Sequence, residues 1–351
     1  MKYSNYQEYL KIWIDILTPK QLLFSEPIIE KLSGKHNVLC TSREYHEVSK
    51  LAKIRHFDLI FVGKHGGGDK KSKLKASIER MGKLSKKIKR FEPDLVISFG
   101  SPEAARISFG LGIKHIMFCD SPHANAVMKL TLPLIQKLLI PYVIPKKEFS
   151  KYGIHEKNIV QYKAIDAAVT MKRKIREDLN SPFKNNNKKN ILIRVEEEEA
   201  AYTSKSSKII PIIQKITKDY KNENVVVLGR YTKQINNLQK IIGNKVKIVK
   251  MSFDGKFLLN KTDIFIGSGG TMTAESALMG IPTISYNAVP NIVEEFLVKK
   301  SLVKRETNPN KVSNHIKKIF ETKNDQNQKR AKKIVKEMED PIEKLIKIIK
   351  N

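Results

Sequence analysis

Short apolar segments alternate with longer amphipathic segments along most of this 351-residue chain. Several of the short segments are nearly continuous runs of valine and isoleucine, which is typical of parallel strands covered on both faces. Parallel strands need long connections, and helices usually form them. The alternation therefore predicts an α/β protein, and the length allows two domains rather than one.

The expected strands share an apolar centre bounded by polar or turn-forming residues. In the first half of the chain they are Lys11–Ile16, Asn37–Thr41, Phe57–Val62, Asp94–Phe99, Lys114–Cys119 and Pro141–Ile144. In the second half they are Ile191–Val195, Asn224–Leu228, Lys245–Val249, Asp263–Gly267 and Pro282–Tyr286. Amphipathic spacing predicts helices at Phe24–Leu32, Lys73–Phe91, Pro102–Phe109, Ser204–Lys218, Thr232–Ile242, Thr271–Met279 and Val312–Glu321.

A polar segment rich in asparagine and lysine, 181–190, separates the two alternating blocks and indicates a linker. We expect two Rossmann-like domains, over 1–180 and 191–335, that face each other across a cleft. The basic amphipathic end of the chain predicts a C-terminal helix within 336–351, and its packing back on the first domain is an open alternative. Ligands of such sheets bind at the carboxyl ends of the strands.

The formal net charge is +30, from 66 lysine and arginine residues against 36 aspartate and glutamate residues. Nucleic-acid binding, attraction to anionic lipid or phosphorylated substrates, and a simple composition bias all explain such a charge. The lysines are spread over many expected helices, and zinc-finger spacing, an aromatic RNA-binding signature and a recognition-helix pattern are missing from the sequence. Nucleic acid is therefore the least favoured partner, and the other two explanations stay open.

Cysteine usage and hydropathy favour a cytoplasmic protein. Cys40 and Cys119 lie in apolar strand-like segments and indicate buried small hydrophobes rather than a disulfide or a metal site. The first ten residues are polar, and no apolar run reaches the roughly 18–20 residues that cross a bilayer. The apolar segment Leu130–Ile144 suits either a peripheral membrane contact or a core helix and strand, and its length favours the core.

One segment, Asp263–Ser285 (DIFIGSGGTMTAESALMGIPTIS), has the pattern of a strand, a glycine turn and a helix. Gly269 and Gly270 let the backbone approach a ligand, and the following helix N-terminus attracts a diphosphate. Thr271 and Thr273 add hydroxyl groups, while the carboxylate of Glu275 suits the two hydroxyls of a ribose. The alternative is an ordinary helix start capped by Thr271; the full pattern favours the ligand site.

Polar residues also follow several other expected strands, where loops of an α/β sheet converge. His123 is the first candidate for a general base or acid, with Asp120 to orient it; capping of the next helix is the alternative. The other candidates for catalysis or ligand binding are Asp15, His65, Gly66 and Arg194.

These remaining candidates have competing explanations. The glycine-rich loop at His65 and Gly66 suits phosphate binding through backbone N–H groups, or a mobile lid. Arg194 suits neutralisation of a diphosphate, or an ion pair with the run Glu196–Glu199. We expect most of those four adjacent carboxylates to be solvated, because they repel one another.

The stretch IGSGGTMTAESALMGIP resembles the signature of nucleotide-sugar enzymes with the B-type glycosyltransferase fold. These include UDP-N-acetylglucosamine 2-epimerases and the peptidoglycan N-acetylglucosaminyltransferase. The whole chain is similar to a largely archaeal family catalogued as domain of unknown function three hundred and fifty-four, through IWIDILTP, GKHGGG, CDSPHANAV and the Gly-Gly-Thr segment. The resemblance implies this fold and a nucleotide-sugar site. We expect that site in the second domain and the acceptor side in the first. The resemblance implies no particular reaction.

The chain departs from the 2-epimerases at two acid/base positions. Those enzymes carry an Asp after the fourth strand and a His-Arg pair after the first strand of the second domain; Ser101 and Ile193-Arg194 stand there in this chain. Epimerisation needs proton abstraction and return, whereas glycosyl transfer needs one base and stabilisation of the leaving diphosphate.

The sequence therefore predicts a glycosyltransferase of surface glycan or glycoconjugate synthesis that works without a metal or other cofactor. Its donor is a nucleotide-diphosphate sugar such as a UDP-sugar, and its acceptor a sugar, a lipid-linked molecule or a protein. A nucleotide-sugar 2-epimerase or hydrolase is the first alternative. A non-catalytic protein that binds a nucleotide or polyanion is the second.

Overall fold

The computed structural model of the chain describes residues 9–175, 181–196, 209–229, 232–243, 246–250, 254–288, 291–322 and 326–350. The expectations for 1–8, 197–199, 204–208 and 245 lie outside these residues. The chain forms two compact units, each described by itself. Unit 1 comprises the described parts of Met1–Thr170 and Glu339–Asn351, and unit 2 those of Met171–Met338.

In unit 1 the described residues form a seven-stranded sheet of order β3-β2-β1-β4-β5-β6-β7, in which every described pairing is parallel. The register sets Ile12 opposite both Val38 and Leu95, so the central strand β1 is paired on both edges. The strands are β1 (Lys11–Ile16), β2 (Asn37–Glu44), β3 (Ile60–Lys64), β4 (Leu95–Ser98), β5 (Lys114–Phe118), β6 (Lys137–Pro141) and β7 (Ile159–Tyr162).

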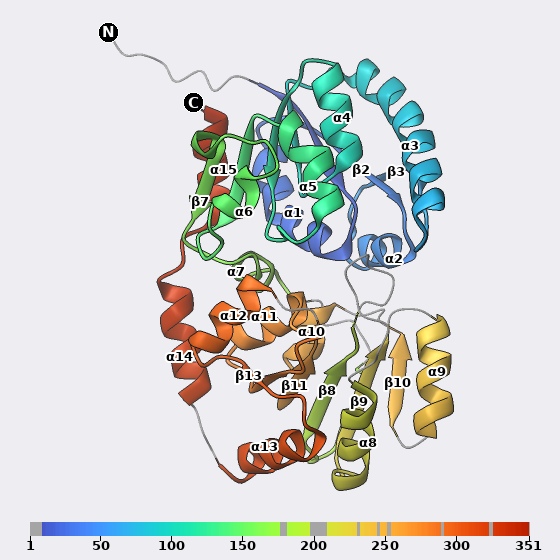
Figure 1. Ribbon diagram of the computed structural model, residues 1–351, viewed down its shortest axis with the longest axis vertical. Helices are drawn as coiled ribbons and strands as arrows, with labels where there is room; N and C mark the ends of the chain where they lie inside the picture. Colours follow the sequence, from blue (N-terminus) through green and yellow to red (C-terminus); the bar gives the residue numbers. More distant parts are fainter. Residues whose placement is uncertain are drawn as a thin grey trace. The chain divides into compact units, whose positions relative to one another are not determined.

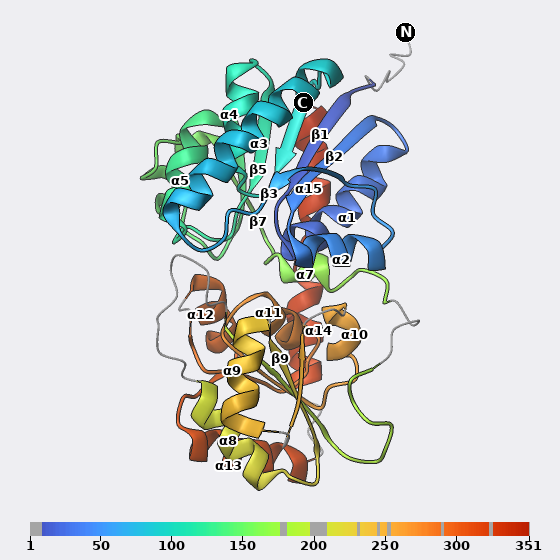
Figure 2. The ribbon, with the colours of Figure 1, turned by 90° about the vertical axis from the view of Figure 1, so that its right-hand side faces the viewer.

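Helices cover both faces of this sheet, as a parallel sheet requires. Figures 1 and 2 show α3, α4 and α5 on one face and α1, α2 and α15 on the other. The helices are α1 (Pro19–Ser33), α2 (His46–Ile54), α3 (Lys70–Phe91), α4 (Pro102–Gly110), α5 (Asn125–Thr131), α6 (Lys147–Ser150), α7 (Ala167–Thr170) and α15 (Pro341–Lys350), with the 3-10 turns η1 (Leu132–Leu134) and η2 (Glu156–Asn158).

The long helix α3 packs on the sheet along one stripe. Arg80, Leu84 and Ile88 recur every four residues and are fully buried, and Trp13 of β1 lies in the same core cluster as the last two. The other faces of α3 are rich in lysine and exposed. Residues four apart lie on one face of a helix, so these three side chains form the buried stripe of α3.

A buried ion pair between Asp15 and Arg80 joins β1 to α3. Arg80 donates to both Asp15 oxygens, at 2.6 and 3.2 Å, and both side chains are completely enclosed. The hydroxyls of Thr41 and Ser101 donate to the same carboxylate, each at 2.6 Å. Burial raises the pKa of Asp15, but Arg80 and these hydrogen bonds outweigh that effect, so its pKa is lowered. The carboxylate is therefore ionised and saturated with donors.

In unit 2 the described residues form a six-stranded sheet of order β10-β9-β8-β11-β12-β13, again with every described pairing parallel. The strands are β8 (Asn190–Arg194), β9 (Asn224–Gly229), β10 (Lys247–Lys250), β11 (Ile264–Gly267), β12 (Thr283–Ser285) and β13 (Lys304–Arg305). The helices are α8 (Ile209–Asp219), α9 (Thr232–Ile242), α10 (Gly255–Leu259), α11 (Thr271–Leu278), α12 (Ile292–Lys299), α13 (Pro309–Glu321) and α14 (Gln326–Lys336).

Alternate residues of β8 enter the two cores of unit 2. Ile191 and Ile193 pack with α8 and α13 in one apolar cluster, while Leu192 packs with α10 and Met272 of α11 in the other. Successive side chains of a strand point to opposite faces of a sheet. Both faces of this sheet are therefore dry, which explains why its strands are continuous apolar runs in the sequence.

The fold class expected from the sequence is confirmed, with one strand misplaced. The strand expected at Pro141–Ile144 is wrong, because β6 occupies Lys137–Pro141 and a turn follows. The apolar run is longer than the strand, and its first part, Leu138–Ile140, pairs with both β5 and β7. Most of the apolar stretch 130–144 is core rather than surface.

Two expectations from composition can be checked. Cys40 and Cys119 are free thiols and are buried, as expected. Among the helices of the described residues, none combines the length and apolar character needed to cross a membrane.

We predict that Leu84→Ala lowers the free energy of unfolding by about 2–5 kcal/mol, because it leaves a cavity under α3. Leu74 lies on the same helix and is 62% exposed, so Leu74→Ala is the matched control and should change stability by about 0.5 kcal/mol or less. Urea unfolding of both variants checks this. Equal losses would mean that α3 does not bury the stripe described above.

Candidate functional site

Each unit has a point where the strand order reverses, and polar residues gather there. In unit 1 the reversal lies between β1 and β4, and in unit 2 it lies between β8 and β11. Loops at the carboxyl ends of two such strands diverge to opposite faces of the sheet and leave a crevice for a ligand. These two points are therefore where a site is expected.

The turn after β11 is built so closely that side chains are excluded. A Cβ on Gly267 would lie 2.5 Å from the Thr273 hydroxyl oxygen and from a ring carbon of Phe265. Gly269 has a φ of +96°, which disfavours any other residue. The Gly269 N–H donates to the Thr273 hydroxyl at 3.2 Å, and its carbonyl accepts from Asn291 at 3.0 Å. Thr273 is thus committed to holding the turn.

The N-terminus of α11 has no side-chain cap. Gly270 is the N-cap residue, and among the described residues no side-chain cap hydrogen bond forms at this helix start. Gly270 is exposed, Thr271 is half-buried, and the nearest atom to a Cβ on Gly270 would be the Ser268 hydroxyl at 4.0 Å. The alternative expectation, that Thr271 caps this helix, is wrong, because Gly270 is the N-cap residue. Free N–H groups and the positive end of the helix dipole therefore face open space at this turn.

Glu275 is buried and paired with an arginine that was not among the residues expected from the sequence. Its Oε1 accepts from Arg173 at 3.0 Å, and Arg173 also donates to Asp254 at 2.8 Å. All three residues are at most 6% exposed. Burial lowers the pKa of Arg173, but Glu275 and Asp254 outweigh it and the pKa is raised. This network holds the Glu275 carboxylate next to the start of α10, where a Cβ on Gly255 would lie 3.7 Å from its Oε2. Its contact with a ribose stays a prediction.

Arg194 lies at the end of β8 and is buried, not on the surface. Its guanidinium donates to the Gly229 carbonyl at 3.1 Å and more weakly to that of Leu228 at 3.4 Å. Glu196 is also buried and accepts from the Tyr286 hydroxyl at 2.6 Å. Arg194 therefore stabilises the carboxyl end of β9 through backbone contacts. The rest of the glutamate run, 197–199, lies outside the described residues.

In unit 1, Lys20 stands at the centre of a polar cluster that was not expected from the sequence. The sequence Thr18-Pro19 starts α1 directly after β1, because Thr18 caps the helix and proline suits its first position. Lys20 then lies in the first turn, at the reversal point. Its ammonium group pairs with Asp120 and, at 2.8 Å, with Asp166, and lies 4.6 Å from the Phe99 ring centre.

The two carboxyl groups that share Lys20 differ in their pKa values. Burial raises the pKa of Asp166 to about 6. The charge of Lys20 opposes this rise, and the charge of Asp120 adds to it. Burial also acts on Asp120, but Lys20 and the Ser121 hydroxyl outweigh it and its pKa is lowered. Tyr162 donates to Asp166 at 2.5 Å. A pair of carboxyls with separated pKa values is an arrangement suited to acid/base chemistry.

His123 lies beside this cluster. The pKa of His123 is lowered, mainly by burial. The charge of Asp120 acts to raise this pKa, and the charge of Lys20 acts to lower it. Its imidazole is therefore neutral at pH 7 and able to accept a proton. The helix that follows, α5, has Ala124 as its N-cap residue and no side-chain cap, so His123 does not cap it.

The other expected site residues of unit 1 lie elsewhere at the same sheet edge. Both oxygens of Asp15 are occupied by the contacts described above, which favour a positioning role over catalysis. His65 stacks on Tyr45 at 4.8 Å, and its Nδ1 accepts from the Gly67 N–H at 3.1 Å. A Cβ on Gly66 would lie 2.7 Å from the Lys73 backbone, so Gly66 lets this loop pack on the start of α3.

The expected site residues thus fall into two groups. Gly269, Gly270 and Thr271 form an open turn in unit 2, with Thr273, Glu275 and Arg194 beneath or beside it as buried supports. Asp120 and His123 form the core of the group in unit 1, joined by Lys20 and Asp166. Lys20 was recognisable from its place after a capped helix start, whereas Asp166 follows β7, a strand that the sequence pattern did not predict.

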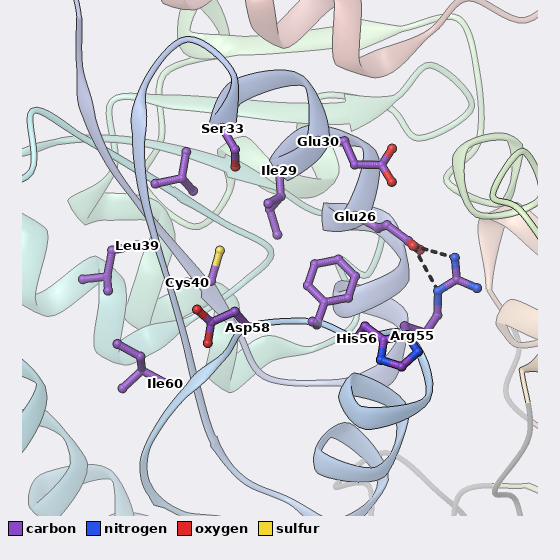
Figure 3. Close-up of a pocket in the computed structure, with 12 residues that line it drawn as sticks. Glu26, Ile29, Glu30, Ser33, Leu39, Cys40, Arg55, His56, Asp58 and Ile60 are labelled. Carbon is purple, nitrogen blue, oxygen red and sulfur yellow. Dashed lines mark hydrogen bonds and ion pairs between the residues drawn. The ribbon is translucent and has the colours of Figure 1, made fainter.

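A hollow of about 460 Å³ in unit 1 lies apart from both groups (Figure 3). It is formed by α1, the first residues of β2 and the approach to β3, and so lies toward the amino ends of the strands. Figure 3 shows the buried pair of Glu26 and Arg55 at one side. Burial and the Asp58 charge raise the pKa of Cys40 to about 12, so its thiol is unreactive there. Across the described residues, no three His, Cys, Asp or Glu side chains are grouped to hold a metal ion.

Comparison with known proteins places the chain among relatives of similar length. A family described as "Protein of unknown function (DUF354)" matches residues 10–351. An archaeal protein, described as "Uncharacterized protein MJ0665" of Methanocaldococcus jannaschii, is 29% identical over 355 residues, which cover 97% of this chain and 98% of that protein. The likeness therefore spans both units.

Solved structures resemble the chain in fold. A UDP-GlcNAc 2-epimerase from Neisseria meningitidis, bound to UDP-GlcNAc, superposes with a TM-score of 0.71 and 17% identity over 97% of this chain and all (100%) of that one. The glycotransferase of kitacinnamycin gives a TM-score of 0.63 and 11% identity over 94% and 95% of the two chains. The chain thus has the B-type glycosyltransferase fold that these enzymes share.

We predict that the stability of the wild type, relative to Asp166→Asn, falls as pH rises from about 4 to about 7. The raised pKa means that the folded state holds this proton more tightly than the unfolded chain. The resulting stabilisation is complete below the ordinary carboxyl pKa and is lost as pH rises through the folded value, by about 1.4 kcal/mol per pH unit between the two pKa values. Urea unfolding at several pH values measures it. The exposed Asp58 offers Asp58→Asn as the control, and parallel pH curves for all three proteins would contradict the assignment.

We also predict that Glu275→Ala lowers the free energy of unfolding by about 3–5 kcal/mol, because it removes one of the two carboxylates that pair with the buried Arg173. Glu275→Gln keeps the shape and one acceptor oxygen and should cost about 1–3 kcal/mol. The control is Glu321→Ala, which breaks only an exposed pair with Lys317 and should cost less than about 1 kcal/mol. If Glu275→Ala costs no more than the control, Glu275 does not compensate Arg173.

Proposed function

We propose a nucleotide-sugar-dependent glycosyltransferase function for this chain, which belongs to the DUF354 family of proteins of unknown function. The uncapped, open N-terminus of α11 at the reversal point of unit 2 is the observation that carries the proposal. In this proposal the diphosphate of the donor lies against the Gly270 and Thr271 backbone. A donor of this class is supported by the Neisseria enzyme of similar fold, which is bound to UDP-GlcNAc.

The α11 N-terminus suits a diphosphate for electrostatic reasons. Its first N–H groups have no partner within the helix, and the helix dipole adds about half a positive charge at that end. During transfer the leaving nucleoside diphosphate gains negative charge, which these groups stabilise without moving. Glu275 sits under the turn and is proposed to accept from the ribose. Metal-free transfer is part of the proposal, and unchanged turnover in excess EDTA is its expected consequence.

The group in unit 1 is proposed to serve the acceptor. A neutral His123, or Asp120 held by Lys20, takes the proton from an acceptor hydroxyl as its oxygen bonds to the anomeric carbon. The bond from that carbon to the diphosphate oxygen breaks, and the nucleoside diphosphate leaves. Lys20 keeps Asp120 ionised, so the carboxylate can orient the acceptor or the imidazole.

A 2-epimerase is the second candidate, and the Asp120–Asp166 pair favours it. Two carboxyls with separated pKa values supply both an acid and a base, which removal and return of a sugar proton require. Product analysis separates the two functions. An epimerase converts the sugar nucleotide without an acceptor and exchanges the sugar proton with solvent deuterium, whereas a transferase needs an acceptor and releases nucleoside diphosphate.

We predict that Gly270→Asp weakens nucleotide binding at least about tenfold while leaving the protein as stable or more stable. Gly270 has the extended backbone of an N-cap residue, φ −86° and ψ −159°, so an aspartate there caps α11 and adds roughly a few tenths of a kcal/mol. The same carboxylate occupies the proposed diphosphate position and repels the negatively charged diphosphate. Calorimetric titration with UDP, GDP, CDP, ADP and dTDP should show one nucleotide bound by the wild type and an affinity at least about tenfold weaker in the variant.

The control is Asn310→Asp, which adds the same charge to the exposed first turn of α13 in the same unit. It should leave nucleotide affinity unchanged. If the wild type binds none of the five nucleotides, or Gly270→Asp binds as well as the wild type, the proposed donor site is wrong.

A further inference from the structure

Arg43 stands at an irregular point of the sheet in unit 1. In the β2–β3 ladder, Ser42 pairs with Phe61 and Glu44 with Lys64, so the register shifts at Arg43. Such bulges occur next to functional sites because they redirect a side chain. Arg43 lies near the carboxyl end of its strand, on the edge where ligands of parallel sheets bind.

The Arg43 guanidinium lacks partners although it is largely enclosed. Its Nε is shielded from solvent and makes no hydrogen bond. Throughout the part of the chain that the structure describes, no acceptor or carboxylate pairs with its other nitrogens either. A guanidinium has five N–H donors, and buried donors are nearly always satisfied. Within the described chain, Nε is the one buried donor of this group without a partner, and the side chain as a whole is half-buried, so its terminal nitrogens stay open to a ligand at this sheet edge.

Neighbouring charges do not supply that acceptor. Arg80 takes both oxygens of Asp15 and also lies 3.5 Å from Glu103, whose other oxygen accepts from Ser77 at 2.9 Å. The two arginines and two carboxylates balance in charge, but Arg80 hydrogen-bonds Asp15, and Glu103 Oε2, 3.5 Å from Arg80, is buried without a hydrogen bond to either arginine. Burial lowers the pKa of Arg43, Arg80 lowers it further, and Glu103, Asp15 and Tyr45 act in the opposite direction.

We infer that Arg43 is the anchor of an oxyanion site in unit 1, which binds a carboxylate or phosphate group of a ligand. The planar guanidinium matches both groups through paired N–H bonds. Tyr45 follows two residues later, and its ring stacks on that of His65 at 4.8 Å. The His65 N–H donates to the Glu44 carbonyl at 3.0 Å, so the glycine-rich loop is fastened next to Arg43. These contacts give the site a rigid wall.

If the proposed function holds, this oxyanion belongs to the acceptor, because the donor diphosphate is assigned to unit 2. The acceptor is then an acidic molecule, carrying a carboxylate or a phosphate. Anion binding at Arg43 does not itself depend on the proposed function, so the two can fail separately.

The test compares the wild type with Arg43→Gln and with the matched control Arg106→Gln, which removes an exposed arginine of α4 in the same unit. Binding of inorganic phosphate and of acetate is titrated at constant ionic strength. We expect one or both anions to bind the wild type and Arg106→Gln equally, and Arg43→Gln at least about tenfold more weakly. The anion that binds tells a phosphate from a carboxylate ligand.

Stability and nucleotide affinity complete the test. Without ligand, Arg43→Gln should be at least as stable as the wild type, since it removes a half-buried charge whose Nε has no hydrogen-bond acceptor, and its nucleotide affinity should be unchanged. Equal anion binding by both variants, no anion binding by the wild type, or an Arg43→Gln protein that is destabilised or unfolded would each overturn the inference. A wild type that binds the anion at Arg43 but binds no nucleotide would overturn only the proposed donor site.

Discussion

The buried pair of Asp15 and Arg80 is the constraint on which unit 1 depends. An enclosed arginine on α3 requires a carboxylate at one fixed place, and the end of the central strand β1 supplies it. Hydroxyls from Thr41 and Ser101 complete the shell, so β1, β2, α3 and the start of α4 meet at one point. Asp15 is thereby saturated, and the polar groups still able to meet a ligand, Lys20 with its two carboxyls, lie on the neighbouring side of the strand reversal.

Unit 2 repeats this principle with different residues. A buried arginine, Arg173, is clamped between Glu275 and Asp254, and the Thr273 hydroxyl holds the glycine turn above them. The supports are dry and fully engaged, whereas the turn itself keeps free N–H groups at its surface. Rigid supports under an open backbone are what binding a charged ligand requires, because the donors are then oriented before the ligand arrives.

The sequence revealed the fold and one of the two candidate groups, for physical reasons. Strands buried on both faces must be apolar runs, so β1, β9 and β11 were recognisable. In 130–144 the run was too long to mark the strand, and β7 was not predicted. The glycine turn is local, so its parts stand together in the chain. The partners of Asp15 and Glu275 lie 65 and 102 residues away, and Asp166 meets Lys20 from the far edge of the sheet. Residue type gave the chemistry of these groups but not their neighbours, which decide whether a carboxylate is available.

The return of the chain to unit 1 has a consequence for synthesis. Glu339 pairs with Lys163 through backbone and side-chain hydrogen bonds, and α15 then packs within unit 1. Unit 2 is one continuous stretch that can fold as soon as it has left the ribosome, while unit 1 waits for the last segment to be made. The half that is translated first is therefore finished last. Until then the place of α15, beside α1 and α2 on one face of the sheet, stays open to other molecules that contact the nascent chain.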